Sequence, residues 1–535
     1  MKNIFKISLL SVMFVFFTNC EVTELDLLED PNNINIESAD PNFILNNVEL
    51  TFSEIMNGLS GPSMAITRMT NMFGTYNQAV DENTFAFEWP AAYGMFVDVD
   101  LLEQINENDP VGIPYHVGVA RILEAYTYMT LVDYLGDVPF SQATNGSEFP
   151  TPMTDDGAVI YAAQIDLIDS AIALLNQETN VQPLFELYFD NEFSKDNWIA
   201  LANTLKLRAY LNTGNAAGIA SLAGENIIDT LEEDFQYNYG TFAVAPESRH
   251  PFYVNNYLAA AGTYMSNQYY DFLNAGNGDA PFEETGIADP RLRYYVYRQR
   301  VGEPSGSNLP CTDNPAYDYC YVGNGYWGRD HADDEGIPND GARRTTYGVY
   351  PAGGAFDRDE FVRARDVTNT LDGAGIFPIY TSSFTHFALA EAALTINTGG
   401  DAAGLLEQGI RLSMTKVTTF GDAETSLDGT DFAATSSDIE AYVTRVTTEY
   451  SAAGSADKLA IVAREWFLAS FGNGVEPYNL YKRTALPNLQ APIFPAATFP
   501  RSFRFPTDEI TANPNITQNS NTDRVFWDTN PADLD

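Results

Sequence analysis

The chain has 535 residues, and its 73 acidic residues against 28 Lys and Arg give a formal net charge of −45 at pH 7. Such acidity argues against nucleic acid or anionic lipid as a ligand, because phosphate groups are bound by cationic side chains. Hydrophobic residues make up 45% of the chain, which is enough for a large core, and the length alone would allow several domains.

The N-terminus has the pattern of a secretory signal. Basic residues precede an apolar stretch over 7–17, which is shorter than the ~20 residues that a membrane helix needs. Cys20 stands where cleavage would occur, and this predicts a bacterial lipoprotein whose lipid is carried by Cys20. The preceding Phe17, Thr18 and Asn19 depart from the usual leucine and small residues. The alternative is a plain secreted protein with an incidental cysteine.

We therefore expect a signal peptide over 1–19 and a lipidated, flexible, acidic stem over 20–40. No apolar run of membrane-spanning length follows Cys20, which predicts a protein tethered to the membrane rather than crossing it. Apolar residues then recur at helical spacing over 43–73, where Gly61-Pro62 predicts an interruption or a kink.

The clearest helix is predicted over 115–135, where a continuous apolar stripe ends at Gly136. Trp198 and Trp466 lie on similar stripes and are expected in the core. The other predicted helices begin at Thr154 or Asp155 and at Ser194, and cover 384–396 and 461–471. Amphipathic helices joined by short loops predict a mainly α fold with tetratricopeptide-like helix pairs.

The predicted helices fall within about 41–223 and 378–471, as parts of a single domain over 41–535. Between them, residues 224–377 are rich in Gly, Pro, Tyr, Asp and Asn with weak periodicity, and residues 472–535 are similarly irregular. Long loops in a compact protein usually carry function, so we expect the 224–377 region to be functional.

At this point the chain resembles a known family. The run ARILEAY at 120–126 and the run LVDYLGDVPF at 131–140 are similar to the hallmark of SusD/RagB proteins, in which a helix ends in a Tyr-Gly-Asp-Val-Pro turn; Leu135 replaces the tyrosine. Further matches follow in order over most of the chain: NW at 197–198, ANTLKLR at 202–208, DPRL at 289–292, GRDH at 328–331, RTTYG at 344–348, LAEA at 389–392, GVEPYN at 474–479 and RFP at 504–506.

The resemblance implies a tetratricopeptide-like scaffold with a loop-built ligand face, lipid-anchored on the exterior of the outer membrane. It also implies a lid-like partnership with a SusC-like TonB-dependent transporter and capture of an oligosaccharide or polysaccharide without catalysis. Two alternatives stay open: a peptide cargo with the same transporter, as in RagB, and a structural or adhesive surface protein.

Sugar binding needs an aromatic face that stacks on a ring, flanked by polar groups that bond its hydroxyls. Two stretches provide this, residues 76–93 and residues 324–330, and the first is where the family commonly contacts sugar. The competing explanation is that each ring fills a junction between loops and scaffold. The stacking candidates are Trp89, Tyr93, Tyr326 and Trp327, and the polar candidates are Asn77, Gln78, Asp81, Asn324 and Arg329.

Cys311 and Cys320 flank a short segment, and in an exported protein such a pair predicts a disulfide. A disulfide close to an exposed Trp327 would hold that ring in place. No cofactor is expected. Asp330, Asp333 and Asp334 offer hard oxygen ligands for a structural Ca²⁺, against the alternative of a solvated acidic loop.

Enzyme motifs are missing from the sequence. The four histidines are scattered without the His-Glu-x-x-His arrangement of zinc hydrolases, and neither a Gly-x-Ser-x-Gly elbow nor a phosphate-binding loop occurs. Paired carboxylates for glycoside hydrolysis carry no information in a chain with 73 acidic residues. We therefore expect a binding protein and rank glycoside hydrolase last.

Overall fold

The computed structural model describes residues 39–189, 192–258, 264–274, 286–297, 326–333, 346–347, 371–420 and 433–534. The chain divides into two compact units, Met1–Asp40 and Pro41–Asp535. The described helices and strands all belong to the second unit. The signal peptide, most of the stem, Cys20, Cys311, Cys320, Asn324 and Asp334 lie outside the described residues.

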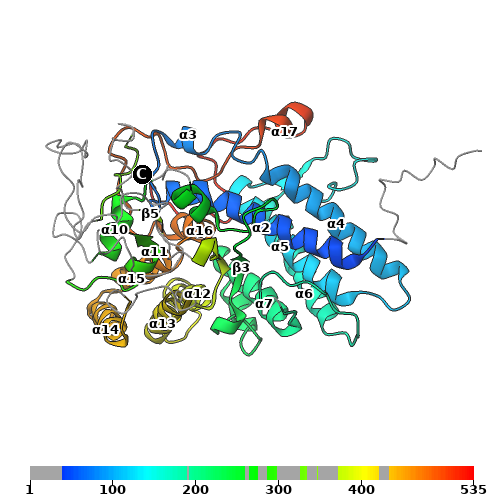
Figure 1. Cartoon of the computed structure of the whole chain (residues 1–535). Helices are drawn as coiled ribbons and strands as arrows, with labels where there is room; N and C mark the ends of the chain where they lie inside the picture. Colours follow the sequence, from blue (N-terminus) through cyan, green and yellow to red (C-terminus); the bar gives the residue numbers. More distant parts are fainter. Residues whose placement is uncertain are drawn as a thin grey trace, which may run out of the picture. The chain divides into compact units, whose positions relative to one another are not determined.

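The N-terminal part of this unit consists of helices that pack on one another in chain order (Figure 1). Helix α5 lies at the centre, and nearly all its side chains are buried between α4, α6 and α2. This burial on every side explains its continuous apolar stripe. The helices are α2 (Pro41–Ile66), α4 (Glu88–Asn108), α5 (Pro114–Leu135), α6 (Gly157–Leu175) and α7 (Lys195–Asn212).

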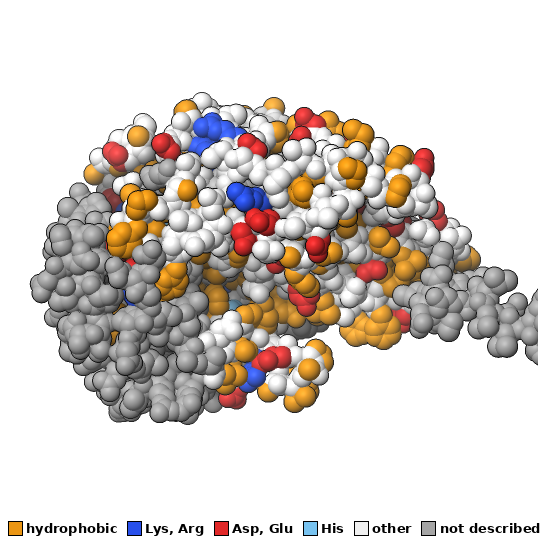
Figure 2. All heavy atoms as spheres, turned by 90° about the horizontal axis from the view of Figure 1, so that it is seen from above, with side chains coloured by type: hydrophobic (Ala, Val, Ile, Leu, Met, Phe, Trp, Pro, Cys, Tyr) orange, Lys and Arg blue, Asp and Glu red, His pale blue; other side chains and the backbone are white. Residues whose placement is uncertain are grey.

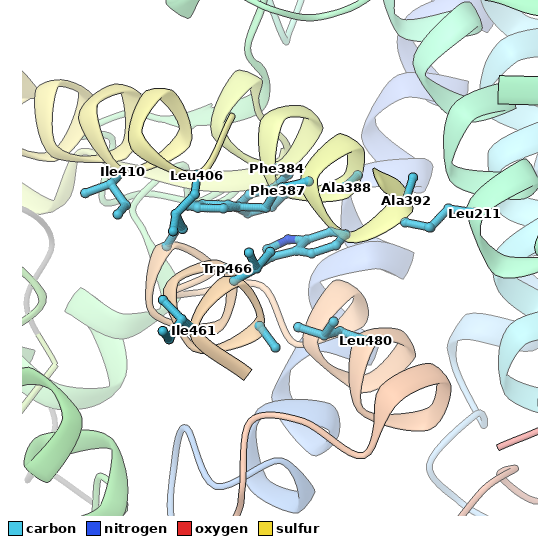
Figure 3. Close-up of a cluster of buried hydrophobic side chains, with 14 of the residues drawn as sticks. Leu211, Phe384, Phe387, Ala388, Ala392, Leu406, Ile410, Ile461, Trp466 and Leu480 are labelled. Atoms are coloured by element: carbon cyan, nitrogen blue, oxygen red, sulfur yellow. The ribbon is translucent and has the colours of Figure 1, made fainter. Parts of the chain in front are cut away.

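A second group of helices packs against α7 through α12. Its core surrounds Trp466, whose ring faces Phe387 and Ala388 of α12, with Leu480 on its other side (Figure 3). Trp466 and Trp198 are both fully buried, which confirms their predicted core positions. The group comprises α12 (Ser382–Thr395), α13 (Ala402–Phe420), α14 (Ser436–Ala452) and α15 (Ser455–Ala469).

Helix α16 (Val475–Thr484) joins the two groups, because it packs on α2 and on α15. Its N-cap residue is Gly474, where a Cβ atom would lie 2.3 Å from the Ser60 carbonyl oxygen and 2.6 Å from the Met64 nitrogen. Only glycine allows the two backbones to approach this closely.

The strands form three antiparallel pairs and no closed sheet among the described residues, so the mainly α fold is confirmed. The pairs are β1 (Val138–Pro139) with β2 (Thr154–Asp155), β3 (Phe235–Tyr239) with β6 (Gly375–Tyr380), and β4 (Val296–Tyr297) with β5 (Thr346–Tyr347). The short helices are α3 (Tyr76–Ala79), α8 (Ala216–Ser221), η1 (Leu231–Glu233), α9 (Pro251–Tyr253), η2 (Val254–Leu258), α10 (Asn267–Leu273), α11 (Leu292–Tyr295), η5 (Leu371–Gly373) and α17 (Thr507–Ala512).

Local structure differs from the predictions in three places. The interruption that was one of the two expectations for Gly61-Pro62 is absent: helix α2 runs through Pro62 to Ile66, because packing of α16 against this turn offsets the ~3 kcal/mol that an interior proline costs. The cap of α6 is Asp156, whose side chain accepts from the Ala158 amide, since the preceding residues pair as strand β2. The stretch 76–93 is not one loop, because α4 begins at Glu88.

Among the described helices, α6 alone has the length and hydropathy of a membrane span. Helices that pack within a folded domain can share this composition, and α6 packs against α5 and α7.

Candidate functional site

The turn that follows α5 is held by a buried carboxylate at Asp133. One oxygen of Asp133 accepts hydrogen bonds from the Tyr161 hydroxyl and, at 2.8 Å, from the Trp527 indole. The other accepts from the Arg208 guanidinium at 2.7 Å and from the Asn479 amide at 2.9 Å. Four donors from α6, α7, α16 and the C-terminal segment therefore converge on α5, and the family-like run at 131–140 serves as a structural junction.

Lys482 adds a second buried cation to this junction. Its Nζ donates to the Asp133 backbone carbonyl and lies 4.1 Å from the Tyr478 ring centre and 4.6 Å from that of Trp527. Burial lowers the pKa of Lys482 to about 7, because it removes the hydration that stabilises the charged ammonium. The negative charge of Asp133 opposes this shift only in part.

The polar candidates of the first stretch lie at the surface of α3 and the turn after it. Asn77 and Gln78 are exposed, and Asp81 is half-buried. The Asn77 oxygen accepts from the Asn521 amide at 3.0 Å, while the Gln78 side chain caps α3 through Thr75. These amides are accessible and partly ordered by neighbours.

The ring of Trp89 is not open to solvent, contrary to the expected stacking platform. Its side chain is 6% exposed, its indole donates to the Glu509 carboxylate at 3.2 Å, and its ring centre lies 5.4 Å from that of Phe505. Tyr93 packs 4.7 Å from Trp89 and donates its hydroxyl to the Pro139 carbonyl at 2.8 Å. Both rings fill the junction between α4 and the C-terminal segment, and their contact with a ligand stays a prediction.

Phe87 belongs to the first stretch but was not chosen as a stacking residue, and it is the exposed ring there, at 54%. The alternation of buried Phe85, exposed Phe87 and buried Trp89 results from the turn that leads into α4. The sequence does not distinguish the three rings, because each is an aromatic residue at or near a helix start that was not predicted.

The second stretch is also covered. Tyr326 is buried and Trp327 is 2% exposed, so the expectation of an exposed Trp327 is wrong in this structure. Gly328 explains the close packing: its amide donates to the Asn267 side chain at 2.7 Å, and a Cβ atom there would lie 2.2 Å from the Met265 carbonyl oxygen. Whether these rings meet a ligand stays a prediction.

The charged candidates of this stretch have partners within the fold. Arg329 is buried, pairs with Asp333 at 2.6 Å and lies over the Tyr264 ring at 5.1 Å. Asp330 accepts from the Asn267 amide at 2.8 Å. Among the described residues, no group of three or more His, Cys, Asp or Glu side chains could hold a metal ion, and Asp330 and Asp333 are buried rather than solvated.

The first predicted stretch meets the residues directly after the second through Tyr76 and His331. The His331 Nε2 lies 3.0 Å from the Tyr76 hydroxyl, and the Ala332 amide donates to the Met72 carbonyl at 3.1 Å. Burial and the nearby Arg68 charge lower the pKa of His331, so the imidazole is neutral in this contact. The two segments, 255 residues apart at this contact, therefore pack against each other in the interior.

The surface of the molecule is poor in cations. On the face drawn in Figure 2, acidic and apolar side chains are spread across the described residues, and Lys and Arg side chains show in only a few places. This arrangement offers no cationic track for a polyanion on that face, and it suits a neutral ligand.

Two cavities open elsewhere among the described residues. One of about 590 Å³ lies at the start of α7 beside Tyr115, Phe193 and Lys195. The other, of about 320 Å³, lies between the turn after α5 and the C-terminal segment. Neither is lined by a residue that the sequence singled out for binding.

Comparison with protein families finds a model described as "Starch-binding associating with outer membrane", which matches residues 32–506. No curated protein matches the chain. The match covers the helical groups, the turn after α5 and both predicted stretches.

Solved structures share the fold. A SusD/RagB family protein from Bacteroides thetaiotaomicron is 17% identical, with a TM-score of 0.67 over 92% of this chain and 100% of that one. A SusD homolog from Bacteroides fragilis is 15% identical, with a TM-score of 0.63 over 92% and 99%. A chitin-binding protein is 18% identical, with a TM-score of 0.65 over 92% and 100%. At these identities the likeness shows the fold alone.

Proposed function

Because this chain belongs to the SusD-like family of starch-binding proteins that associate with the outer membrane, we propose that it captures a glycan at the cell surface and delivers it to a SusC-like TonB-dependent transporter. The lipid on Cys20 would anchor the protein on the exterior of the outer membrane. The protein acts by binding and release, without catalysis.

The observation that carries the proposal is the contact between Tyr76 and His331, which joins the first stretch to the residue directly after the second. Helix α3, which begins at Tyr76, presents the exposed amides of Asn77 and Gln78, and the turn before α4 presents the exposed ring of Phe87. An aromatic face with neighbouring amides is the chemistry that binds sugar rings. We call the surface of Asn77, Gln78 and Phe87 the α3–α4 surface.

Trp89, Tyr93, Tyr326 and Trp327 stay in the proposal as rings behind this surface. Their direct contact with a glycan would require the side chains that cover them to move. The low density of cations and the net charge of −45 favour a neutral glycan over a polyanion.

Calorimetric titration of the mature chain from Glu21 with maltoheptaose and with chitohexaose tests the proposal. We expect a dissociation constant on the order of micromolar for one of them, as suits a solvated site that must release its cargo. The double variant Asn77→Ala, Phe87→Ala should bind at least about tenfold more weakly. The matched control is Phe242→Ala, which removes another exposed phenylalanine and should bind as the parent does.

Unchanged binding by the double variant would place the glycan away from the α3–α4 surface. Binding of a mixed peptide pool, with no response to either glycan, would instead favour the peptide cargo of the RagB branch. A protein stabilised by neither ligand would match the adhesive alternative.

A further inference from the structure

The cavity of about 320 Å³ next to the turn after α5 is lined mainly by polar side chains, with a few apolar ones that include Phe526. Its volume is at the lower end of the ~300–1,000 Å³ typical of ligand pockets. One wall is the turn itself, and the opposite wall is the C-terminal segment. Gly136 and Asp137 line the first wall, and Asn515, Asp523, Arg524 and Phe526 line the second.

The C-terminal wall is anchored on both sides of Phe526. Val525 and Trp527 are buried, and the Trp527 indole is bonded to Asp133 in the core. The Asn519 amide ties the same segment to the Leu135 carbonyl at 2.6 Å. Phe526 itself is 36% exposed, so an accessible aromatic ring stands on a backbone that is held on either side.

The ring of Phe526 is also held in place. Tyr161 meets it edge-on, with ring centres 5.0 Å apart and planes at 75°. On another side lies Gly157, where a Cβ atom would come 3.1 Å from the Phe526 Cδ1. A ring that is already ordered loses little conformational entropy when a ligand stacks on it.

Three residues that line the same cavity carry hydrogen-bonding groups without a partner among the described residues. The exposed Arg524 guanidinium has no ion-pair or hydrogen-bond partner among the described residues. Asp137 accepts from the Gly157 amide with Oδ1, and Asp523 accepts from the Ser520 amide with Oδ2. The second oxygen of each carboxylate takes part in no hydrogen bond between described residues. The cavity therefore offers a free donor and free acceptors, which sugar hydroxyls can satisfy because they both donate and accept.

We propose that this cavity binds one neutral pyranose unit, as a second saccharide site apart from the α3–α4 surface. Stacking on Phe526 would orient the ring, and Arg524, Asp137 and Asp523 would bond its hydroxyls. Two carboxylates against one guanidinium disfavour an anionic sugar. This inference rests on the proposed function in one respect, because it takes a glycan as the source of the pyranose. The two sites have no binding residue in common.

Saturation-transfer NMR with methyl β-D-glucopyranoside and methyl N-acetyl-β-D-glucosaminide, against sodium glucuronate, tests this site on the mature chain. We expect transfer to at least one neutral glycoside in the parent and in the Phe242→Ala control. Phe526→Ala should weaken binding about tenfold, since it removes the stacking face. Arg524→Ala should weaken it severalfold, and this variant removes no described contact, so it preserves the test if Phe526→Ala fails to fold.

Three results would overturn the proposal: no transfer to either neutral glycoside in the parent, transfer to glucuronate as strong as to the glycosides, or unchanged transfer in folded Phe526→Ala and Arg524→Ala variants. The Asn77→Ala, Phe87→Ala variant separates the two sites. It should retain the full signal, and loss of the signal in that variant would assign the glycoside to the α3–α4 surface and refute the second site.

Discussion

Trp527 donates its indole N–H to the buried carboxylate of Asp133 over 2.8 Å, joining residues 394 positions apart. The same carboxylate is bonded by Arg208 and Asn479, so one side chain of α5 connects two other helices and the end of the chain. The C-terminal segment is thereby held as a wall of the saccharide cavity proposed above.

Trp527→Phe keeps an aromatic ring but removes this hydrogen bond. We expect a loss of about 1–3 kcal/mol in the free energy of unfolding, because a buried carboxylate oxygen is left with one donor fewer. Urea unfolding followed by circular dichroism measures it. Trp89→Phe is the matched control: its partner Glu509 is half-buried and can be hydrated, so the loss should be smaller. Equal losses in the two variants would contradict the argument that the buried Asp133 carboxylate depends on its hydrogen-bond donors.

Lys482 should make the free energy of unfolding depend on pH above neutrality. Its pKa is about 7 in the folded state and ~10.4 in the unfolded chain, so between these values the unfolded state binds a proton that the folded state lacks. Stability from this group therefore rises as pH increases from about 7 to 10, by on the order of 4 kcal/mol.

The test is urea unfolding of Lys482→Met at pH 7 and pH 9.5, compared with the parent. The free energy of unfolding of the variant should not rise between these pH values, and it should exceed that of the parent by the largest amount at pH 7. Lys458→Met, which removes a half-buried amine over the Tyr450 ring, should leave the parent's pH profile in place. A parent and a Lys482→Met variant with parallel profiles would refute the assignment.

Glu49 of α2 and Glu186 form a buried pair of carboxyl groups. Burial raises both pKa values, that of Glu186 to about 7, and the charge of Glu186 raises that of Glu49 further. Between about pH 4.5 and 7 the folded state holds protons that the unfolded chain has lost. Stability from the pair therefore falls as pH increases through this range, by on the order of 3 kcal/mol.

Glu49→Gln should reduce this fall, because the amide has no proton to lose as pH rises, while the burial that raises the pKa of Glu186 stays in place. We expect a higher melting temperature than the parent at pH 8 and little difference at pH 5, measured by differential scanning fluorimetry. Glu54→Gln, an exposed position on the same helix, serves as control and should follow the parent at both pH values. A Glu49→Gln variant that melts below the parent at pH 8 would rule out this account.

Gly474→Ala should disturb the close packing of α16 on α2. The added Cβ would meet backbone atoms of Ser60 and Met64, which cannot move as a side chain can, so we expect a loss of at least ~2 kcal/mol in the free energy of unfolding. Gly94→Ala on α4 meets nothing within 4 Å and should stabilise that helix by ~0.5–1 kcal/mol. Thermal unfolding of the two variants should therefore shift in opposite directions.

Helix periodicity predicted burial correctly where the apolar face of a single helix determines which side chains are buried. The stripes over 115–135 and around Trp198 and Trp466 identified buried helices, because a side chain on the apolar face of an amphipathic helix is buried whatever covers it. The helix that begins at Glu88 was missed, since its polar and apolar residues mix without a clear stripe. At Pro62 the helix continues where an interruption was one of the expectations, because packing by α16 outweighs the local penalty of the proline.

The candidate site shows where such reasoning stops. The stretches around Asn77 and Arg329 were chosen for composition, and the structure brings them together through Tyr76 and His331. Composition did not tell the exposed ring of Phe87 from the buried ring of Trp89. It also gave no sign of the cavity beside Phe526, whose walls are far apart in the chain.

The sequence by itself determined the net acidity, the helical scaffold and the likeness to SusD/RagB proteins, and it predicts an export signal, because each depends on composition or on spacing along a single segment. Only the tertiary structure decided which aromatic rings face solvent and which carboxylates are buried. The burial of such side chains depends on what distant segments cover them, as Glu509 covers Trp89 and Trp527 reaches Asp133, and such long-range contacts leave no periodic trace in the chain.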